Sequence, residues 1–362
     1  MFVRKLVLNN YRNYSHLEAD FSSSHIYITG NNAIGKTNII EAIHYLSCGR
    51  SFRKANDSEL IQRGEKEASI YLVFHTDKDD SDHSLSAVIG HNYKVFAFDD
   101  EKVKTLSSIL GKLLITYYDP SQVFFFKGEP ADRRKLLDET LSQLSPKYLH
   151  AISRYKKLLK ERNAALNQNY DKDVIDVLRD QLINLAYRIV LERTALVKSL
   201  AEPINQIYNS LFGKASTLQL VYKTNSPLAT DQKVFVNESL QLFDRCKSLE
   251  NMRKQTLIGP HRDDLTALLN KESLASYGSQ GENRLASLSL KIALRQHLKK
   301  ELGDEPILLL DDVTSDLDAI RCQNLLNNIS TGQIFVTGTR ITAEFSNYSV
   351  YETDGSQLLW RK

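Results

Sequence analysis

The feature that most constrains the fold is a pair of motifs at opposite ends of the chain. Residues 30–37 read Gly-Asn-Asn-Ala-Ile-Gly-Lys-Thr, which fits the GxxxxGK[ST] pattern of a phosphate-binding loop. An apolar run, Ile-Leu-Leu-Leu, ends in Asp311 and Asp312 about 275 residues later. A compact enzyme of the P-loop type keeps these two motifs only a few strands apart. The spacing therefore predicts a head built from both ends of the chain, with a domain inserted between them.

The bulk composition sets the domain count but leaves the kind of partner open. A chain of 362 residues with 42 % hydrophobic content is too large for one ordinary core, and two domains fit it best. Acidic and basic residues nearly cancel and leave a net charge of +3. Because the field of the whole protein is weak, a polyanion would have to bind at local patches. The mild basicity neither proves nor excludes DNA binding.

Cysteine spacing and hydropathy indicate a reducing, aqueous environment. Cys48, Cys246 and Cys322 are scattered, which argues against a structural zinc site and a disulfide framework. No stretch approaches the roughly 18 to 20 apolar residues of a membrane span, and the N-terminus lacks a signal-peptide pattern. We expect a soluble cytoplasmic protein, associated with the nucleoid if it binds DNA, and no membrane partner.

The first third of the chain reads as strands around one helix. A strand at 24–29 leads into the glycine loop, and residues 38–47 have the apolar spacing of a helix that Gly49 could end. The first residues also alternate as a strand does. Apolar and polar residues alternate again from about 68 to 120, which predicts an antiparallel meander that includes the run Leu-Leu-Ile-Thr-Tyr-Tyr.

The middle of the chain is rich in Lys, Glu and Leu and poor in glycine, so residues 130–212 are predicted to be helical. A strand at 218–222, a helix at 238–255 and a last strand at 333–337 follow. The domains expected are residues 1–119 for the first part of the head, 120–250 for a mostly helical arm, and 251–362 for the second part of the head. The fold class is α/β.

The glycine loop indicates a nucleotide site. Glycines let successive backbone N–H groups turn inward around phosphates at a helix N-terminus, while the lysine reaches the β/γ-phosphates and the hydroxyl ligates Mg²⁺. Lys36 and Thr37 have these roles. The nucleotide-binding residues expected here are Gly30, Asn31, Asn32, Ala33, Ile34, Gly35, Lys36 and Thr37. The pattern alone arises by chance, but the flanking strand and helix support it.

Two further motifs have both a plain and a functional interpretation. The run ending in Asp311 and Asp312 could be a buried strand with a solvated turn. Alternatively, Asp311 holds Mg²⁺ and Asp312 orients or deprotonates the attacking water. Likewise, Ser279 and Glu282 could form an ordinary capping box. In the functional interpretation Ser279 and Gly281 face the γ-phosphate of an ATP bound to another subunit. The order of the motifs favours the functional interpretation of each.

These motifs together resemble the ABC-type ATPase heads of the SMC/Rad50 class, and more narrowly the bacterial RecF family. The resemblance covers essentially the whole chain and is highly specific. The further stretches that carry it are Asn10-Tyr-Arg-Asn-Tyr, Gly49-Arg-Ser-Phe-Arg53, Gly128-Glu-Pro-Ala-Asp-Arg-Arg-Lys-Leu-Leu-Asp138, Leu159-Lys-Glu-Arg-Asn-Ala-Ala-Leu166 and Gly259-Pro-His-Arg-Asp-Asp-Leu265.

The resemblance implies a weak ATPase that acts as a switch. ATP with Mg²⁺ would join two copies into a dimer on double-stranded DNA near gaps or single-strand/double-strand junctions, and slow hydrolysis would reopen it. By the same resemblance, the partners are RecR and RecO, which assist loading of RecA in gap repair, fork maintenance and SOS induction. Asp316 and Asp318 would line the dimer interface. Glu282, where the family often has Gln, adds negative charge near the triphosphate, and a γ-phosphate sensor would fall at Thr337 or Thr339.

Several basic residues, and the histidine of one turn, have both a structural and a functional interpretation. Arg12, Arg53 and Lys54, with the pair Arg133 and Arg134, could be surface charges or contacts to DNA phosphates. His261 and Arg262 could hold a Gly-Pro turn or contact nucleotide or DNA. An ABC transporter subunit would not normally carry so large a helical arm, and a structural SMC or Rad50 protein needs long heptad repeats or a zinc hook. A binding protein with a degenerate site is disfavoured by the complete set of motif residues.

Overall fold

The computed structural model describes residues 1–213, 215–313 and 318–361. Contacts within the chain define two compact units. The first unit contains Met1–Gln122, Asn209–Lys214 and Leu288–Lys362, and the second contains Val123–Tyr208 and Ala215–Ser287. The sequence places an arm at 120–250, whereas the second unit extends to 287. The domain boundaries proposed from the sequence stay a prediction.

One sheet of the first unit is antiparallel. Its strand order is β2 (Tyr14–Asp20), β1 (Phe2–Tyr11), β4 (Glu67–Thr76), β5 (Ser81–Gly90), β6 (Lys94–Phe98) and β7 (Glu101–Lys102). Buried residues alternate with more exposed ones along β4, as expected for a sheet with one face on a core. The predicted opening strand is confirmed, and so is the meander for β4 to β7.

The other sheet of the first unit carries the motifs. Its order is β15 (Leu358–Trp360), β14 (Ser349–Thr353), β3 (His25–Thr29), β13 (Ile334–Gly338), β12 (Ile307–Leu310) and β8 (Ile115–Tyr118). All neighbours are parallel except β14 and β15. Assigning Ile115–Tyr118 to the meander was therefore wrong, because β8 pairs in parallel with β12. Ending the strands at 333–337 was also wrong, since β14 and β15 follow.

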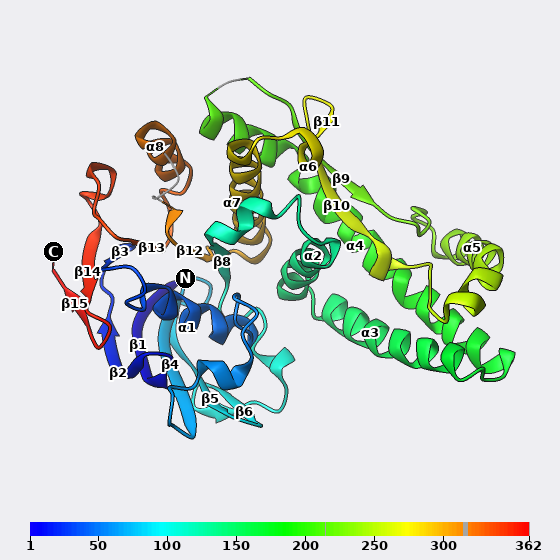
Figure 1. The fold of residues 1–362 in the computed structure, drawn as a ribbon, viewed down its shortest axis with the longest axis horizontal. Coiled ribbons are helices and arrows are strands. Elements are labelled where there is room, and N and C mark those ends of the chain that lie inside the picture. The colour runs from blue at the N-terminus through cyan, green and yellow to red at the C-terminus, as the bar shows by residue number, and fades with distance from the viewer. Residues whose placement is uncertain (214, 314–317, 362) are drawn as a thin grey trace. The chain divides into compact units, whose positions relative to one another are not determined.

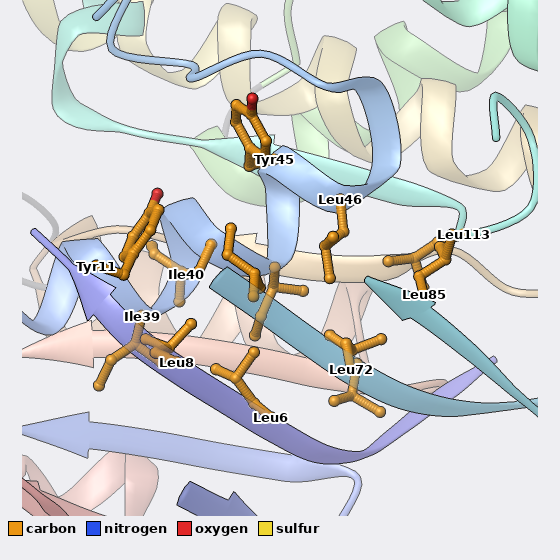
Figure 2. Packing of buried hydrophobic residues seen from close by; sticks show 14 of the residues in the cluster. Leu6, Leu8, Tyr11, Ile39, Ile40, Tyr45, Leu46, Leu72, Leu85 and Leu113 are labelled. Atoms are coloured by element: carbon orange, nitrogen blue, oxygen red, sulfur yellow. The ribbon is translucent and has the colours of Figure 1, made fainter. Parts of the chain in front are cut away.

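Helix α1 (Lys36–Cys48) packs on the antiparallel sheet and forms the main core of the first unit. Figure 2 shows Ile39, Ile40 and Leu46 of the helix over Leu6 and Leu72 of the strands. All five side chains are buried, so each contributes roughly 1.5–3 kcal/mol of hydrophobic free energy. Gly49 ends the helix as predicted, with φ of 65°, a left-handed conformation that favours glycine.

The second unit is mostly helical (Figure 1). Its helices are α2 (Pro130–Leu144), α3 (Pro146–Asn167), α4 (Lys172–Phe212, with the last four residues in the first unit), α5 (Gln232–Arg253) and α6 (Leu274–Tyr277). The predicted helical region 130–212 is confirmed. Ser145 separates α2 from α3 and caps α3 by accepting a hydrogen bond from the Tyr148 N–H. The predicted helix at 238–255 begins six residues earlier, at Gln232.

A small antiparallel sheet completes the second unit. Its order is β11 (Glu272–Ser273), β10 (Asp264–Leu269) and β9 (Leu218–Lys223), so the strand predicted at 218–222 is confirmed. Helix α7 (Gln280–Leu302) begins in the second unit and belongs to the first from Leu288, which also contains α8 (Ala319–Asn328). No helix among the described residues is long and apolar enough to span a bilayer.

Candidate nucleotide-binding site

The glycine loop lies between β3 and α1, at the carboxyl end of a central parallel strand. Its backbone is left-handed at Gly30 (φ 154°), Ala33 (φ 61°) and Gly35 (φ 113°). A Cβ atom on Gly35 would lie 2.6 Å from Nδ2 of Asn13, so this position needs glycine for space as well as for conformation. The loop leads directly into the N-terminus of α1, where free N–H groups favour an anion.

Asn13, in the turn between β1 and β2, holds the outside of this loop. Its Nδ2 donates to the carbonyl of Ile34 at 3.1 Å and to that of Gly355 at 2.8 Å. Its Oδ1 accepts from Nδ2 of Asn38 in α1 at 2.6 Å. Asn13 thus joins the glycine loop, the first helix and the β14–β15 turn. The sequence placed Asn13 in a stretch typical of the family but gave it no role.

Lys36 is folded back onto its own loop. Its Nζ donates to the carbonyls of Gly30 at 2.8 Å and Asn31 at 2.7 Å, and the residue is 8 % exposed. Burial lowers the pKa of the Lys36 ammonium, and the charges of Asp312 and Asp311 act against that shift. A phosphate in the loop would offer stronger, charge-assisted acceptors than these two carbonyls.

Thr37 and Asp311 meet across 274 positions of the chain. The Thr37 hydroxyl donates to Oδ1 of Asp311 at 2.9 Å, with Asp311 directly after β12. Burial raises the pKa of the Asp311 carboxyl, while the hydroxyls of Thr337 and Thr37 oppose this. Both predicted metal ligands therefore lie at one edge of the parallel sheet, in one unit.

Thr337, at the end of β13, links the two aspartates. Its hydroxyl donates to Oδ1 of Asp311 at 2.6 Å and accepts from the backbone N–H of Asp312 at 3.0 Å. Asp312 has a φ of 45°, a left-handed conformation uncommon outside glycine. Thr337 is fully buried, and its hydrogen is already donated to Asp311. The structure thus gives Thr337 a positioning contact, whereas the sequence considered it only as a γ-phosphate sensor.

The donor set fits a magnesium ion. Mg²⁺ prefers oxygen ligands, keeps several waters, and usually takes only one or two carboxylates from the protein. Thr37 Oγ1 and Asp311 Oδ1 are such oxygens, close together at a helix N-terminus. Within the described ranges no group of three or more His, Cys, Asp or Glu side chains gathers as a fully protein-coordinated metal would need.

The residues predicted to face the γ-phosphate of an ATP on another subunit lie at the start of α7 (Gln280–Leu302), in the second unit. Ser279 and Gly281 are exposed. Oε2 of Glu282 accepts from both the N–H and the hydroxyl of Ser279 at 2.8 Å, and the Glu282 N–H donates to Ser279 Oγ at 3.2 Å. The capping box is confirmed. The Ser279 hydroxyl therefore already donates to a carboxylate in this conformation.

The remaining predicted interface residues follow β12. Asp318 caps α8, its Oδ1 accepting from the Arg321 N–H at 2.9 Å. Asp316 lies outside the described residues. Thr339 is exposed, and its carbonyl accepts from the Thr29 hydroxyl at 3.4 Å.

Several basic residues have structural partners. Arg133 is buried and forms a bidentate pair with Asp264 at 2.7 and 3.0 Å, so interpreting it as a solvated or DNA-contacting charge was wrong. Arg12 pairs in the same way with the fully buried Glu41, at 2.9 and 2.8 Å. The sequence could not reveal these pairs, because the acids lie far away in the chain or on another element.

His261 holds the turn that contains it. Its Nε2 lies 2.9 Å from the Thr256 carbonyl, and its Nδ1 lies 2.7 Å from the hydroxyl of Tyr155. Burial lowers the pKa of His261 to about 4, so the ring is neutral at neutral pH. Since a carbonyl can only accept, Nε2 carries the proton and Tyr155 donates to Nδ1. Of the two interpretations that the sequence left open for His261, these contacts support the one in which it holds the turn.

Comparison with known proteins places the chain in a family. The RecF/RecN/SMC N terminal domain family matches residues 2–349. A protein of Lachnoclostridium phytofermentans named "DNA replication and repair protein RecF" is 37 % identical over 98 % of this chain and 96 % of its own. One of Halalkalibacterium halodurans with the same name is 35 % identical over 99 % of each chain.

Solved structures of this family have the same fold as this chain. One described as "Structure of the recombination mediator protein RecF-ATPrS in RecFOR pathway" matches with a TM-score of 0.92 and 26 % identity, covering 100 % of this chain and 98 % of that one. An SMC head bound to part of ScpA matches with a TM-score of 0.59 and 16 % identity over 100 % and 98 % of the two chains, and is similar in fold alone. The chain belongs to the RecF family, within the RecF/RecN/SMC N-terminal domain proteins.

Proposed function

We propose that this chain is an ATP-binding and ATP-hydrolysing protein of recombinational DNA repair, which dimerises with ATP and uses slow hydrolysis as a timer. The observation that carries the proposal is the contact of Thr37 with Asp311, next to a lysine that is held by the glycine loop. Support for ATP and for DNA repair comes from the names of the relatives and from a solved RecF structure described as ATP-bound, which is 26 % identical to this chain.

Each residue of the site has a role in this proposal. The backbone N–H groups of residues 30–37 and the ammonium of Lys36 bind the phosphates. Thr37 and Asp311 hold Mg²⁺, which when bound neutralises phosphate charge. Asp312 orients the attacking water and accepts its proton. Asn13 and Thr337 keep the loop and the two aspartates in place.

The active site is completed by a second copy of the chain. Ser279 and Gly281 lie at an exposed helix N-terminus, which can supply N–H and hydroxyl donors to a γ-phosphate bound by the partner. A two-fold dimer then contains two equivalent sites, because the same surfaces meet twice. Ser279 must exchange its bond to Glu282 for a bond to the phosphate when the dimer forms.

The finer assignments rest on the family resemblance. The dimer binds double-stranded DNA near gaps or single-strand/double-strand junctions, and DNA stimulates its weak ATPase. It cooperates with RecR and RecO in loading RecA, and so serves gap repair, fork maintenance and SOS induction. The description of a similar solved structure as a recombination mediator of the RecFOR pathway supports this assignment.

A mixing experiment tests the composite site. Each site consists of the glycine loop of one copy and the N-terminus of α7 of the other. Lys36→Met removes the phosphate ligand of the glycine loop, and Ser279→Arg blocks the N-terminus of α7, so neither variant alone should turn over ATP. In an equal mixture half of the dimers contain one intact site, which predicts recovery of about a quarter of the wild-type rate. Lys36→Met mixed with the double variant Lys36→Met/Ser279→Arg is the control and should stay inactive. A mixture as inactive as this control would reject the composite site.

A further inference from the structure

A pocket of about 300 Å³ lies in the second unit, away from the nucleotide-binding residues in the sequence. Helix α2 lines it with Arg134, Lys135 and Asp138, and Asp138 lies four residues after Arg134 and three after Lys135, so it neighbours both on the helix surface. Helix α3 lines it with Tyr155 and Lys156, among others, and α4 and the short helix at 260–262 complete the lining. Its volume is at the small end for ligand sites and suits a group of a few heavy atoms.

The pocket carries an excess of positive charge. Asp138 is the only carboxylate among its described lining residues, and both of its oxygens are already paired. Oδ1 accepts from Arg193 at 2.7 Å, and Oδ2 accepts from Lys156 at 2.9 Å. Arg193 also pairs with the buried Asp263 at 3.0 Å. The single acid of the lining is therefore shared between two cations and has no charge left for a third.

Arg134 takes part in none of these ion pairs. Its Nη1 donates to the backbone carbonyl of Asp263 at 2.8 Å, and no carboxylate of the described residues lies within ion-pair distance of it. Partial burial and then the charge of Arg193 lower the pKa of the Arg134 guanidinium. Its neighbour Arg133, by contrast, is fully paired with Asp264. Of two adjacent arginines, one pairs directly with a carboxylate, whereas the other lines a pocket with the charges of Asp264, Asp263 and Asp138 near it but none in direct contact.

We propose that this pocket binds a phosphate group, with Arg134 as its direct ligand and with Lys135 and Lys156 flanking it. A guanidinium offers two parallel N–H donors that match two phosphate oxygens, and a phosphate supplies the negative charge that the pocket lacks. Lys135 and Lys156 are 36 % and 61 % exposed, so each can exchange its present carboxylate, Glu139 at 3.5 Å and Asp138 at 2.9 Å, for a ligand that enters from solvent. The phosphate is either part of a nucleic-acid backbone or a free polyphosphate.

The test uses the full-length chain and two probes. The pyrophosphate samples carry Lys36→Met, so that phosphate binding at the glycine loop is weakened equally among them, whereas the duplex samples keep Lys36 and contain ATP, on which the proposed dimer depends. Inorganic pyrophosphate is titrated calorimetrically, and a fluorescent DNA duplex is titrated at several salt concentrations. Arg134→Gln is compared with Lys160→Gln, a matched control that removes one positive charge from an exposed site on α3 outside this pocket.

Arg134→Gln should weaken binding of at least one probe by at least about tenfold, while Lys160→Gln stays within about twofold. Weaker binding of both probes, with the slope of log K for the duplex against log salt concentration reduced by about 0.9, assigns the site to a nucleic-acid backbone. Loss of pyrophosphate alone assigns it to a free polyphosphate. If Arg134→Gln fails to fold, the exposed pair Lys135→Gln/Lys156→Gln replaces it, with the same expectation. A folded variant that binds both probes as the control does overturns the proposal.

The duplex arm rests on the proposed function, whereas the pyrophosphate arm does not. Failure of the chain with Lys36 intact to bind duplex in the presence of ATP would count against the proposed function. A difference between Arg134→Gln and Lys160→Gln, in either arm, reports on the pocket alone.

Discussion

Replacing Thr337 by valine should weaken both the fold and the magnesium site. Thr337 is fully buried, and its hydroxyl contacts both Oδ1 of Asp311 and the N–H of Asp312. Valine keeps the branched shape but has no hydroxyl. The change therefore removes two hydrogen bonds without opening a sizeable cavity, which makes the expected loss a measure of these bonds.

The magnitude follows from the two partners of the hydroxyl. A hydrogen bond to a charged carboxylate contributes about 1.5–3 kcal/mol, and a buried N–H left without its acceptor costs about 1–3 kcal/mol. We expect the free energy of unfolding to fall by about 2.5–6 kcal/mol. Since partners that orient a metal ligand typically contribute 10–100-fold in affinity, the Mg²⁺ concentration for half-maximal ATP turnover should rise by about that factor.

Urea unfolding and the Mg²⁺ dependence of ATP turnover measure the two effects. The control is Thr116→Val, because Thr116 is a buried threonine of the same parallel sheet, on β8, whose hydroxyl makes no hydrogen bond within the described residues. The control should change the unfolding free energy by less than about 1 kcal/mol. If Thr337→Val unfolds at the wild-type urea concentration and keeps the wild-type Mg²⁺ requirement, the positioning role is refuted.

Three further changes test other parts of the site. Glu282→Gln removes a negative charge from beside the Ser279 hydroxyl, so the ATP-driven dimer should bind up to about tenfold more tightly in sedimentation experiments. Unchanged or weaker association would argue against a role of Ser279 in binding the partner's ATP. Asn13→Ala removes the hydrogen bonds to the carbonyls of Ile34 and Gly355 that hold the glycine loop, so the Kd for ATP should rise by about tenfold. Because Asn13 is exposed, the melting temperature should change little. Burial lowers the pKa of His261 to about 4, below its ordinary value of 6.5. The neutral ring therefore stabilises the fold fully above pH 6.5, and this stability is lost as the pH falls toward 4. The free energy of unfolding should fall by up to about 1.4 kcal/mol per pH unit in that range. His261→Gln should flatten this pH dependence in denaturant titrations, whereas the exposed-site variant His150→Gln should keep it.

The sequence located the nucleotide motifs because each is local. The glycine loop, its flanking strand and the helix after it lie within 25 consecutive residues, and short-range spacing determines their type. The aspartates after β12 were found for the same reason, as an apolar run followed by acids. Their roles were expected from the combination of motifs, and one of them, Asp311, accepts a hydrogen bond from Thr37 at 2.9 Å.

What the sequence missed depends on partners far apart in the chain. Asn13 contacts the carbonyl of Gly355, which is 342 positions away, and no local pattern marks such a contact. The pairing of Arg133 with Asp264 spans 131 positions. Strand β8 was assigned to the wrong sheet because a short apolar run does not reveal which neighbours it pairs with. Periodicity predicts that a strand or helix forms but leaves its partners open.

The most direct test of the central claim is ATP turnover per molecule across a range of protein concentrations, with and without duplex DNA. Lys36→Met serves as the inactive control. Because each proposed site needs residues of two copies, the specific rate should rise with protein concentration and rise further with DNA. A specific rate that is independent of both would contradict the composite site and indicate that one copy of the chain hydrolyses ATP alone.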